Sequence, residues 1–354
     1  MTPLPEFLSS THPLFDLRSP SEFCQGHIPG ARSLPLLDDA ERAHVGTVYK
    51  QISPAQAFDL GIRYVSPKLP LLIDTLRNCS DKLRLMCWRG GMRSQILSRL
   101  LTAGGFQIQT LEGGYKAFRR WVLTSLSKTE LSHFKLIVLG GLTGCGKTHL
   151  LRELCQRGEQ VLDLEALANH RGSHFGHLGQ LEQPTTEHFE NQIATTLRKF
   201  NLSLPVWLED EGWNLGKCTL PQMLIEAKEE SPWIEIRSTL EDRISKLIQD
   251  YGNASPEALT ACILRLEKRL GSERTRQACR AIASNDLRGA IEITLDYYDR
   301  TYTKALSKKS IPPTHVLHWN DCDREQLLTL LIELGKMQTV SIAMNDSISC
   351  RGNA

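Results

Sequence analysis

The feature that most constrains this fold is a glycine-rich phosphate-binding pattern in the middle of the chain. Residues 141–148 read Gly-Leu-Thr-Gly-Cys-Gly-Lys-Thr, directly after the apolar run 136–139 and before a segment with helical spacing at 149–156. In a strand–loop–helix unit of this kind, the backbone N–H groups of the loop surround a diphosphate. We therefore expect an α/β domain with phosphate contacts at Gly141, Gly144, Gly146, Lys147 and Thr148, the last also a ligand for Mg²⁺.

Two further segments of this half carry candidate ligands. The acidic run 209–211 follows a second apolar strand at 204–208, where such folds hold a Mg²⁺-binding carboxylate. We assign Asp210 to that metal together with Thr148, although a solvated turn explains the run nearly as well. Residues 170–177 contain three histidines, but this segment has glycines and no cysteine or carboxylate. It is therefore expected to be a mobile anion-binding loop, with His170 and Arg171 as contacts.

The N-terminal half contains a cysteine in a position suited to nucleophilic chemistry. A buried strand at 83–86 leads into Cys87-Trp-Arg-Gly-Gly-Met-Arg-Ser, after which a helix begins. Converging N–H groups and the positive end of the helix dipole, with Arg89 and Arg93, favour the thiolate and can hold an oxyanion. A buried core thiol is the alternative, and it is the better interpretation of Cys79, Cys155, Cys262 and Cys279.

Composition bounds the remaining possibilities. A length of 354 residues suggests about two domains, and no apolar run reaches the ~18 residues of a membrane span. The N-terminus lacks a secretory pattern and the ten cysteines show no C-x-x-C pair, so a cytoplasmic protein with reduced thiols and no membrane partner is expected. Residues 1–126 carry 15 Lys and Arg against 10 Asp and Glu, which suits an anionic substrate, although ordinary charge scatter explains it as well.

Segments on either side of Cys87 resemble the signatures of rhodanese domains. The opening signature is matched by Asp-Leu-Arg at 16–18 and Gly-His-Ile-Pro-Gly-Ala at 26–31, and the closing one by Leu-Glu-Gly-Gly-Tyr at 111–115. In that family the loop cysteine carries a persulfide or a related chalcogen adduct. The five residues between Cys87 and Arg93 resemble instead the longer loop of rhodanese-fold phosphatases, which has room for a tetrahedral anion. The resemblance thus favours a phosphorus-containing donor.

The order of the two motifs, with the segments 41–50 and 163–173, resembles the bacterial tRNA 2-selenouridine synthases over nearly the whole chain. That resemblance implies a wobble 2-thiouridine substrate in tRNAs for lysine, glutamate and glutamine. Geranyl diphosphate would alkylate the sulfur, and selenium from selenophosphate would then replace it through a selanyl-sulfide on Cys87. Selenophosphate synthetase is an implied partner, and no redox cofactor is expected. Gly212 and Trp213 depart from the Ser-Arg that the family pattern leads us to expect.

The fold expected from these features is α/β, with a rhodanese-like domain at 1–127 and a P-loop NTPase-like domain at 128–341. The second domain includes a helical insert at about 240–306, and residues 342–354 are expected to be a disordered tail. Within the insert, residues 261–280 carry six Lys and Arg against two Glu, which suggests a tRNA-binding surface or a solvated helical face.

Two other functions remain open on the sequence. One is a P-loop small-molecule kinase with a regulatory rhodanese domain, which would transfer phosphate independently of Cys87. The other is a non-catalytic module that binds tRNA or a protein partner without turnover.

Overall fold

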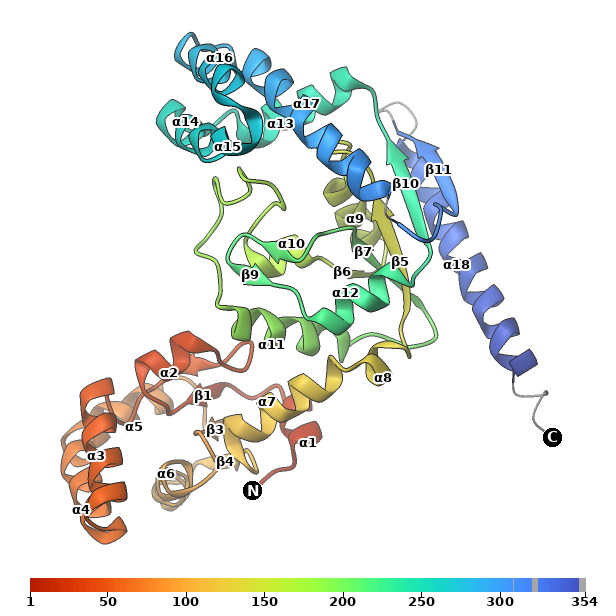
Figure 1. Cartoon of the computed structure of the whole chain (residues 1–354). Coiled ribbons are helices and arrows are strands. Elements are labelled where there is room, and N and C mark those ends of the chain that lie inside the picture. The colour runs from red at the N-terminus through yellow and green to blue at the C-terminus, as the bar shows by residue number, and fades with distance from the viewer. Residues whose placement is uncertain (308, 320–323, 350–354) are drawn as a thin grey trace. The chain divides into compact units, whose positions relative to one another are not determined.

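The computed structural model describes residues 1–307, 309–319 and 324–349, with the backbone alone for 338–349 (Figure 1). The chain divides into two compact units. The N-terminal unit comprises Met1–Ser125 together with Glu187–Thr195, and the C-terminal unit comprises the remainder. The sequence places a boundary at residue 127, but it gives no sign that a later segment, Glu187–Thr195, completes the first unit.

The N-terminal unit is built on a parallel sheet with the strand order β2-β1-β3-β4. Its strands are β1 (Leu14–Asp16), β2 (Arg32–Ser33), β3 (Lys82–Met86) and β4 (Gln107–Thr110). Its helices are α1 (Leu4–Ser9), α2 (Pro20–Gln25), α3 (Asp39–Gln51), α4 (Pro54–Val65), η1 (Ser66–Lys68), α5 (Leu69–Arg77), α6 (Met92–Ala103) and α7 (Gly114–Ser125). Helix α11 (Thr186–Leu197) supplies the added segment.

Apolar burial explains where these elements lie. Leu83, Leu85 and Met86 of β3 are fully buried, and they pack in one cluster with residues of β1, α5 and α6. Adjacent parallel strands bring their carboxyl ends to the same edge, and Asp16 of β1 lies opposite Met86 of β3. The segments that follow these two strands therefore meet at that edge.

The C-terminal unit has a five-stranded parallel sheet with the order β11-β10-β5-β7-β6. Its strands are β5 (Lys135–Gly140), β6 (Gln160–Leu162), β7 (Pro205–Glu209), β10 (Trp233–Arg237) and β11 (His315–His318), and β8 (Asn214–Leu215) and β9 (Cys218–Thr219) form a small hairpin. All five residues of β7 are buried, as expected for a strand covered on both faces. Strands β5 and β7 are neighbours, so the loops after them meet at one edge of the sheet.

Helices surround this sheet and form a separate cluster beyond it (Figure 1). Those associated with the sheet are α8 (Lys128–Leu131), α9 (Lys147–Gln156), α10 (Leu164–Ala168), α12 (Gln222–Glu229) and α18 (Arg324–Ser349). The other helices have their own core around Ile244, Ile263 and Leu295. They are α13 (Leu240–Tyr251), α14 (Pro256–Arg265), α15 (Glu267–Leu270), α16 (Ser272–Ala283) and α17 (Leu287–Leu306).

The C-terminal end differs from the sequence-based expectation. The backbone of residues 342–349 continues helix α18, whereas the sequence predicts a disordered tail from residue 342. Residues 350–354 of that tail lie outside the described residues. Within the described part of the chain, no helix combines the length and apolar character needed to cross a bilayer. The α/β fold predicted for both halves is confirmed.

Candidate functional site

Cys87 lies at the carboxyl end of β3, where the chain turns through two glycines into helix α6. Its side chain is 2% exposed, and its Sγ lies 3.2 Å from the hydroxyl of Ser94 in the first turn of α6. The Ser94 hydroxyl also lies 3.2 Å from the carbonyl of Gly91, to which it donates. A hydroxyl so close can stabilise a thiolate by hydrogen bonding, which is the form that attacks an electrophile.

The closing signature holds the cysteine loop by close backbone contact. The N–H of Tyr115 donates to the carbonyl of Cys87 at 2.9 Å, and that of Lys116 donates to the carbonyl of Trp88 at the same distance. A Cβ on Gly114, whose φ is +59°, would overlap the Cys87 carbonyl and the Gly90 nitrogen. Glycine is therefore required at Gly114 by both backbone conformation and space.

The opening signature supports the same loop from beneath. Asp16 and Arg18 form a fully buried ion pair at 2.6 Å, and Arg18 also donates to the carbonyl of Gly26. The Arg18 guanidinium lies 3.7 Å from the ring centroid of Tyr115 and 5.8 Å from that of Trp88, the neighbour of Cys87. The two signatures that the sequence suggests are thus joined in one structure around the cysteine.

The two arginines assigned to this loop differ in their surroundings. Arg93 is a quarter exposed and lies 3.5 Å from the carboxylate of Glu22. Burial alone would raise the pKa of Glu22, but Arg93, the Ser19 backbone and Arg42 together lower it below the usual value. Arg89 is exposed at the mouth of the loop. Both arginines line the cavity that opens at Cys87, where they can meet an anion.

The phosphate-binding loop of the C-terminal unit joins β5 to α9 as the sequence predicts. Gly141, Gly144 and Gly146 all have positive φ, and a side chain at Gly146 would overlap the ring of Trp319. The ammonium of Lys147 folds back over the loop to the carbonyl of Gly141 at 2.9 Å.

Residues from the helical insert fix this loop in position. The N–H of Gly141 donates to the hydroxyl of Tyr302 on α17 at 2.5 Å. Arg243 of α13 donates to the carbonyl of Thr143 at 2.8 Å, and its guanidinium pairs with both carboxylate oxygens of Asp299. The loop is therefore held to helices that the sequence identifies only as an insert.

Three carboxylates gather beside the loop and fit a divalent cation. Glu165, Glu209 and Glu211 each offer an oxygen, and these atoms lie within 4.8 Å of one another. Thr148 donates to Glu165 at 3.0 Å, and one oxygen of Glu209, which is 1% exposed, has no hydrogen-bond partner. Burial first and the Glu211 carboxylate second raise the pKa of Glu165 to about 8, and the pKa values of Glu209 and Glu211 are raised as well. A cation would relieve this crowding of negative charge.

The assignment of Asp210 to the metal is not what the structure shows. Its carboxylate forms ion pairs with Lys228 at 3.1 Å and Lys309 at 2.7 Å. Although burial opposes this, the two ammonium groups lower the pKa of Asp210. Successive residues of the acidic run point to different partners, so the residues on either side, Glu209 and Glu211, join the carboxylate cluster instead.

The histidine-containing loop also divides between two roles. Arg171 lines the phosphate cavity, donates to the carbonyl of Asp250 at 2.9 Å and stacks over Tyr251. His170 is 6% exposed and does not belong to the residues that line this cavity. The structure therefore supports an anion contact for Arg171, whereas His170 belongs to the packing of its own loop.

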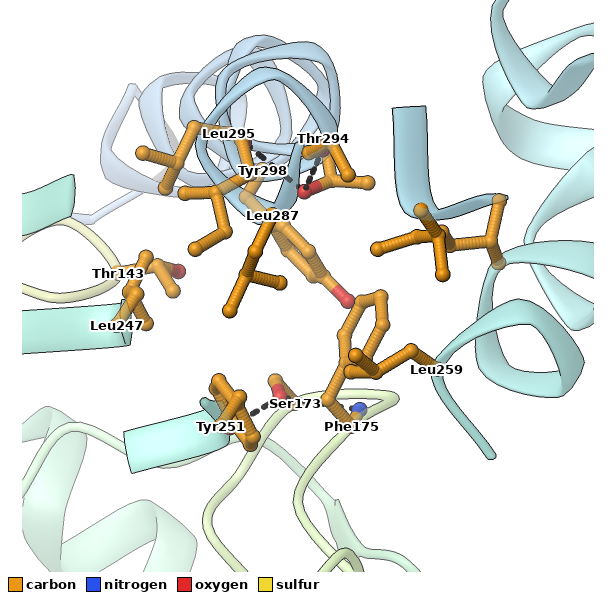
Figure 2. Close-up of a pocket in the computed structure, with 14 residues that line it drawn as sticks. Thr143, Ser173, Phe175, Leu247, Tyr251, Leu259, Leu287, Thr294, Leu295 and Tyr298 are labelled. Carbon is orange, nitrogen blue, oxygen red and sulfur yellow. Dashed lines mark hydrogen bonds between the residues drawn. The ribbon is translucent and has the colours of Figure 1, made fainter. Parts of the chain in front are cut away.

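The phosphate cavity, about 210 Å³ in volume, continues into an apolar recess within the helical insert. Both share Thr143, Ser173, Leu247, Tyr251 and Tyr298 on their walls. Figure 2 shows the recess, with Leu247, Leu259, Leu287 and Leu295 directed into it and the Ser173–Tyr251 hydrogen bond at its edge. A ligand in this place would have a charged end at the loop and an apolar end among the helices.

A parallel α/β unit with a nucleophilic cysteine loop, followed by a P-loop unit with a carboxylate cluster, defines a two-domain transferase. Residues 5–120 match the rhodanese-like domain family, and residues 134–324 match the tRNA 2-selenouridine synthase AAA domain. The chain belongs to the tRNA 2-selenouridine synthase family, and it is an enzyme of that family.

Three relatives named tRNA 2-selenouridine synthase illustrate the extent of the similarity. That of Sulfurovum sp. is 38% identical over 290 residues, which are 75% of this chain and 78% of the relative. That of Marinobacter nauticus is 33% identical and covers 84% of this chain and 89% of the relative. That of Shewanella piezotolerans is 33% identical, with 86% and 91% covered.

Sequence reasoning missed two functional contributions. Glu165 lies in a segment that carries the family resemblance, but only the fold places its carboxylate beside Thr148. Its signal was a single acidic residue after a short strand, which is too common to single out. The apolar recess was missed because its walls come from separate helices between residues 247 and 298 and from the loops at 143 and 173–175.

Proposed function

We propose that this protein converts the wobble 2-thiouridine of tRNA to 2-selenouridine in two steps, geranylation followed by selenation. Two separate anion-binding loops, one at Cys87 and one at Lys147, support a reaction with two phosphorus-containing substrates. The tRNAs concerned are those for lysine, glutamate and glutamine, and the reaction belongs in the cytoplasm. Selenophosphate synthetase is the partner that would supply selenium.

In the first step, the sulfur of 2-thiouridine attacks C1 of geranyl diphosphate. A carbon–sulfur bond forms, the carbon–oxygen bond breaks, diphosphate leaves with the electron pair and N3 of the base loses its proton. The observation that carries the proposal is the continuity of the phosphate cavity with the apolar recess in Figure 2. The recess, about 40 Å³, has room for about three waters, which suits the distal end of a hydrocarbon chain better than a nucleobase.

Chain residues have distinct parts in this step. Lys147 and the loop N–H groups stabilise the charge that develops on the leaving diphosphate. Glu165, Glu209 and Glu211 would hold Mg²⁺, which would supply further neutralisation of that charge. Thr148 lies beside the same cluster and offers a hydroxyl to the cation.

In the second step, the Cys87 thiolate takes selenium from selenophosphate. A sulfur–selenium bond forms, the selenium–phosphorus bond breaks and phosphorus leaves with the electron pair as phosphite. The terminal selenium then attacks C2 of the base and expels geranylthiolate. Two equivalents of a low-molecular-weight thiol release 2-selenouridine and restore Cys87 as they become a disulfide.

The test is to expose thiolated tRNA to the Cys87→Ser protein with geranyl diphosphate, selenophosphate, Mg²⁺ and a thiol. We expect S-geranyl-2-thiouridine to accumulate without 2-selenouridine, since serine is less ionised and cannot form the carrier bond. Cys24→Ser, at an exposed cysteine of the same unit, is the matched control and should complete both steps. Nucleoside mass analysis reads out both products.

Two results would contradict the proposal. Normal 2-selenouridine formation by Cys87→Ser would mean that selenium passes directly to the tRNA. Orthophosphate in place of phosphite, with a phosphocysteine at Cys87, would mean that the thiolate attacks phosphorus and sets hydroselenide free. Phosphoryl transfer to a small molecule, unaffected by Cys87→Ser, would favour a kinase instead.

A further inference from the structure

A cavity of about 610 Å³ opens at Cys87 within the N-terminal unit, and the chemistry described above leaves it without an occupant. Helices α3 and α4 form one wall, and the cysteine loop with helix α6 forms the other. Its size falls in the range of small-molecule sites, which is roughly 300–1,000 Å³.

The wall of this cavity is apolar although it is open to solvent. Large side chains between 38% and 55% exposed line it, namely Tyr49, Phe58, Ile62, Met92, Ile96 and Leu100. Isolated apolar residues are common on protein surfaces, but a group that shares one concave site marks a place where an apolar ligand binds. Helix α3, which carries part of the family-like segment 41–50, contributes Val45, Gly46 and Tyr49 to it.

One end and the rim of the cavity have the opposite character. Cys87, Arg89 and Arg93 lie at the end formed by the cysteine loop, and Arg42 and Lys50 also belong to its wall. Among the described residues that line it there is no Asp or Glu. The site therefore suits a molecule with an apolar chain attached to an anionic body, and the anionic part would meet the arginines.

We propose that this cavity binds the geranyl chain of S-geranyl-2-thiouridine tRNA during selenation and holds the departing geranylthiol. The inference rests on the proposed two-step function. Selenium on Cys87 must reach C2 of the base, and the bond that breaks joins C2 to the sulfur carrying the chain. The chain must then lie within a few bonds of Cys87, and the apolar wall begins there.

Geranyl diphosphate is the less suitable occupant of this cavity. Its diphosphate calls for a divalent cation held by carboxylates, and the described lining residues offer none. The carboxylate cluster that can hold the cation belongs to the C-terminal unit. The chain therefore has two apolar sites of different character, one for the donor and one for the alkylated product.

The experiment compares selenation of two anticodon stem-loops, one with S-geranyl- and one with S-methyl-2-thiouridine, supplied with selenophosphate and a thiol. We expect the unchanged protein to prefer the S-geranyl substrate by at least about tenfold in kcat/KM, because burial of a ten-carbon chain is strongly favourable. Ile62→Asp should reduce kcat/KM for the S-geranyl substrate at least about tenfold and leave the S-methyl substrate within about twofold.

Controls keep this result interpretable. Leu71→Asp introduces the same charge at a 73% exposed residue of α5 outside the cavity, and it should leave the preference unchanged. Geranylation of thiolated tRNA by Ile62→Asp should equal that of the unchanged protein, which shows that the variant is folded. Binding of the two stem-loops to Cys87→Ser, measured without turnover, should show the same preference for the geranyl chain.

Other outcomes would overturn the inference. If Ile62→Asp keeps the full S-geranyl preference, the chain does not bind in this cavity. If Ile62→Asp loses geranylation instead, the cavity serves the first step. Failure of the unchanged protein to selenate the S-geranyl stem-loop would refute the proposed function itself, and this result is distinct from the other two.

Discussion

Removal of the Lys147 ammonium tests the assignment of geranyl diphosphate to the phosphate-binding loop. Burial opposes the charge on Lys147, but the nearby Cys145, Glu209 and Glu211 groups raise its pKa, so the side chain is a cation at neutral pH. In Lys147→Ala, a diphosphate leaving group would lose this cation and still face the carboxylates.

The size of the effect follows from the role of the group. Loss of one donor that stabilises developing negative charge lowers rates by about 10²- to 10³-fold, or about 2.7–4 kcal/mol. The remaining loop N–H groups persist in the variant, so we expect geranylation to fall into that range rather than to vanish. Selenation of a supplied S-geranyl stem-loop should be unchanged, because that step uses Cys87.

The assay measures kcat/KM for geranylation with geranyl diphosphate and thiolated tRNA, at saturating Mg²⁺. Lys217→Ala is the matched control, since Lys217 is exposed and lies outside the phosphate cavity. Geranylation within about threefold of the unchanged protein would refute the reasoning. The loop would then hold another ligand, and phosphoryl transfer should be measured.

Two further predictions concern charge. The pKa of Glu165 is raised to about 8, so the folded metal-free protein binds a proton that the unfolded chain has released; stability should fall as pH rises from about 5 to about 8. Thermal melts should show a shallower fall for Glu165→Gln, and added Mg²⁺ should restore stability at about pH 8; an unchanged slope would contradict this. For the basic segment, tRNA affinity should decrease, and its salt dependence should weaken by about 0.9 log units per lost contact, when three exposed arginines are changed to Glu. Unchanged affinity in a filter-binding assay would remove this surface from the interface; the arginines are Arg265, Arg269 and Arg276.

Local sequence determined the two reactive loops. An apolar strand followed by closely spaced glycines and a helix has few ways to fold, and this places Cys87 and Lys147 at the carboxyl ends of β3 and β5. The pairing of Asp16 with Arg18 and the contacts of Gly114 also follow from short signatures, because the residues lie at or beside strand ends that meet at one edge.

Tertiary structure alone decided which side chains share a site. Successive residues leave the backbone in different directions, so Asp210 meets lysines while Glu209 and Glu211 meet Glu165, some 45 residues earlier in the chain. The two apolar cavities were equally hidden, because each needs side chains from helices far apart in sequence. Sequence spacing specifies local geometry, whereas the convergence of distant side chains depends on how the whole core packs.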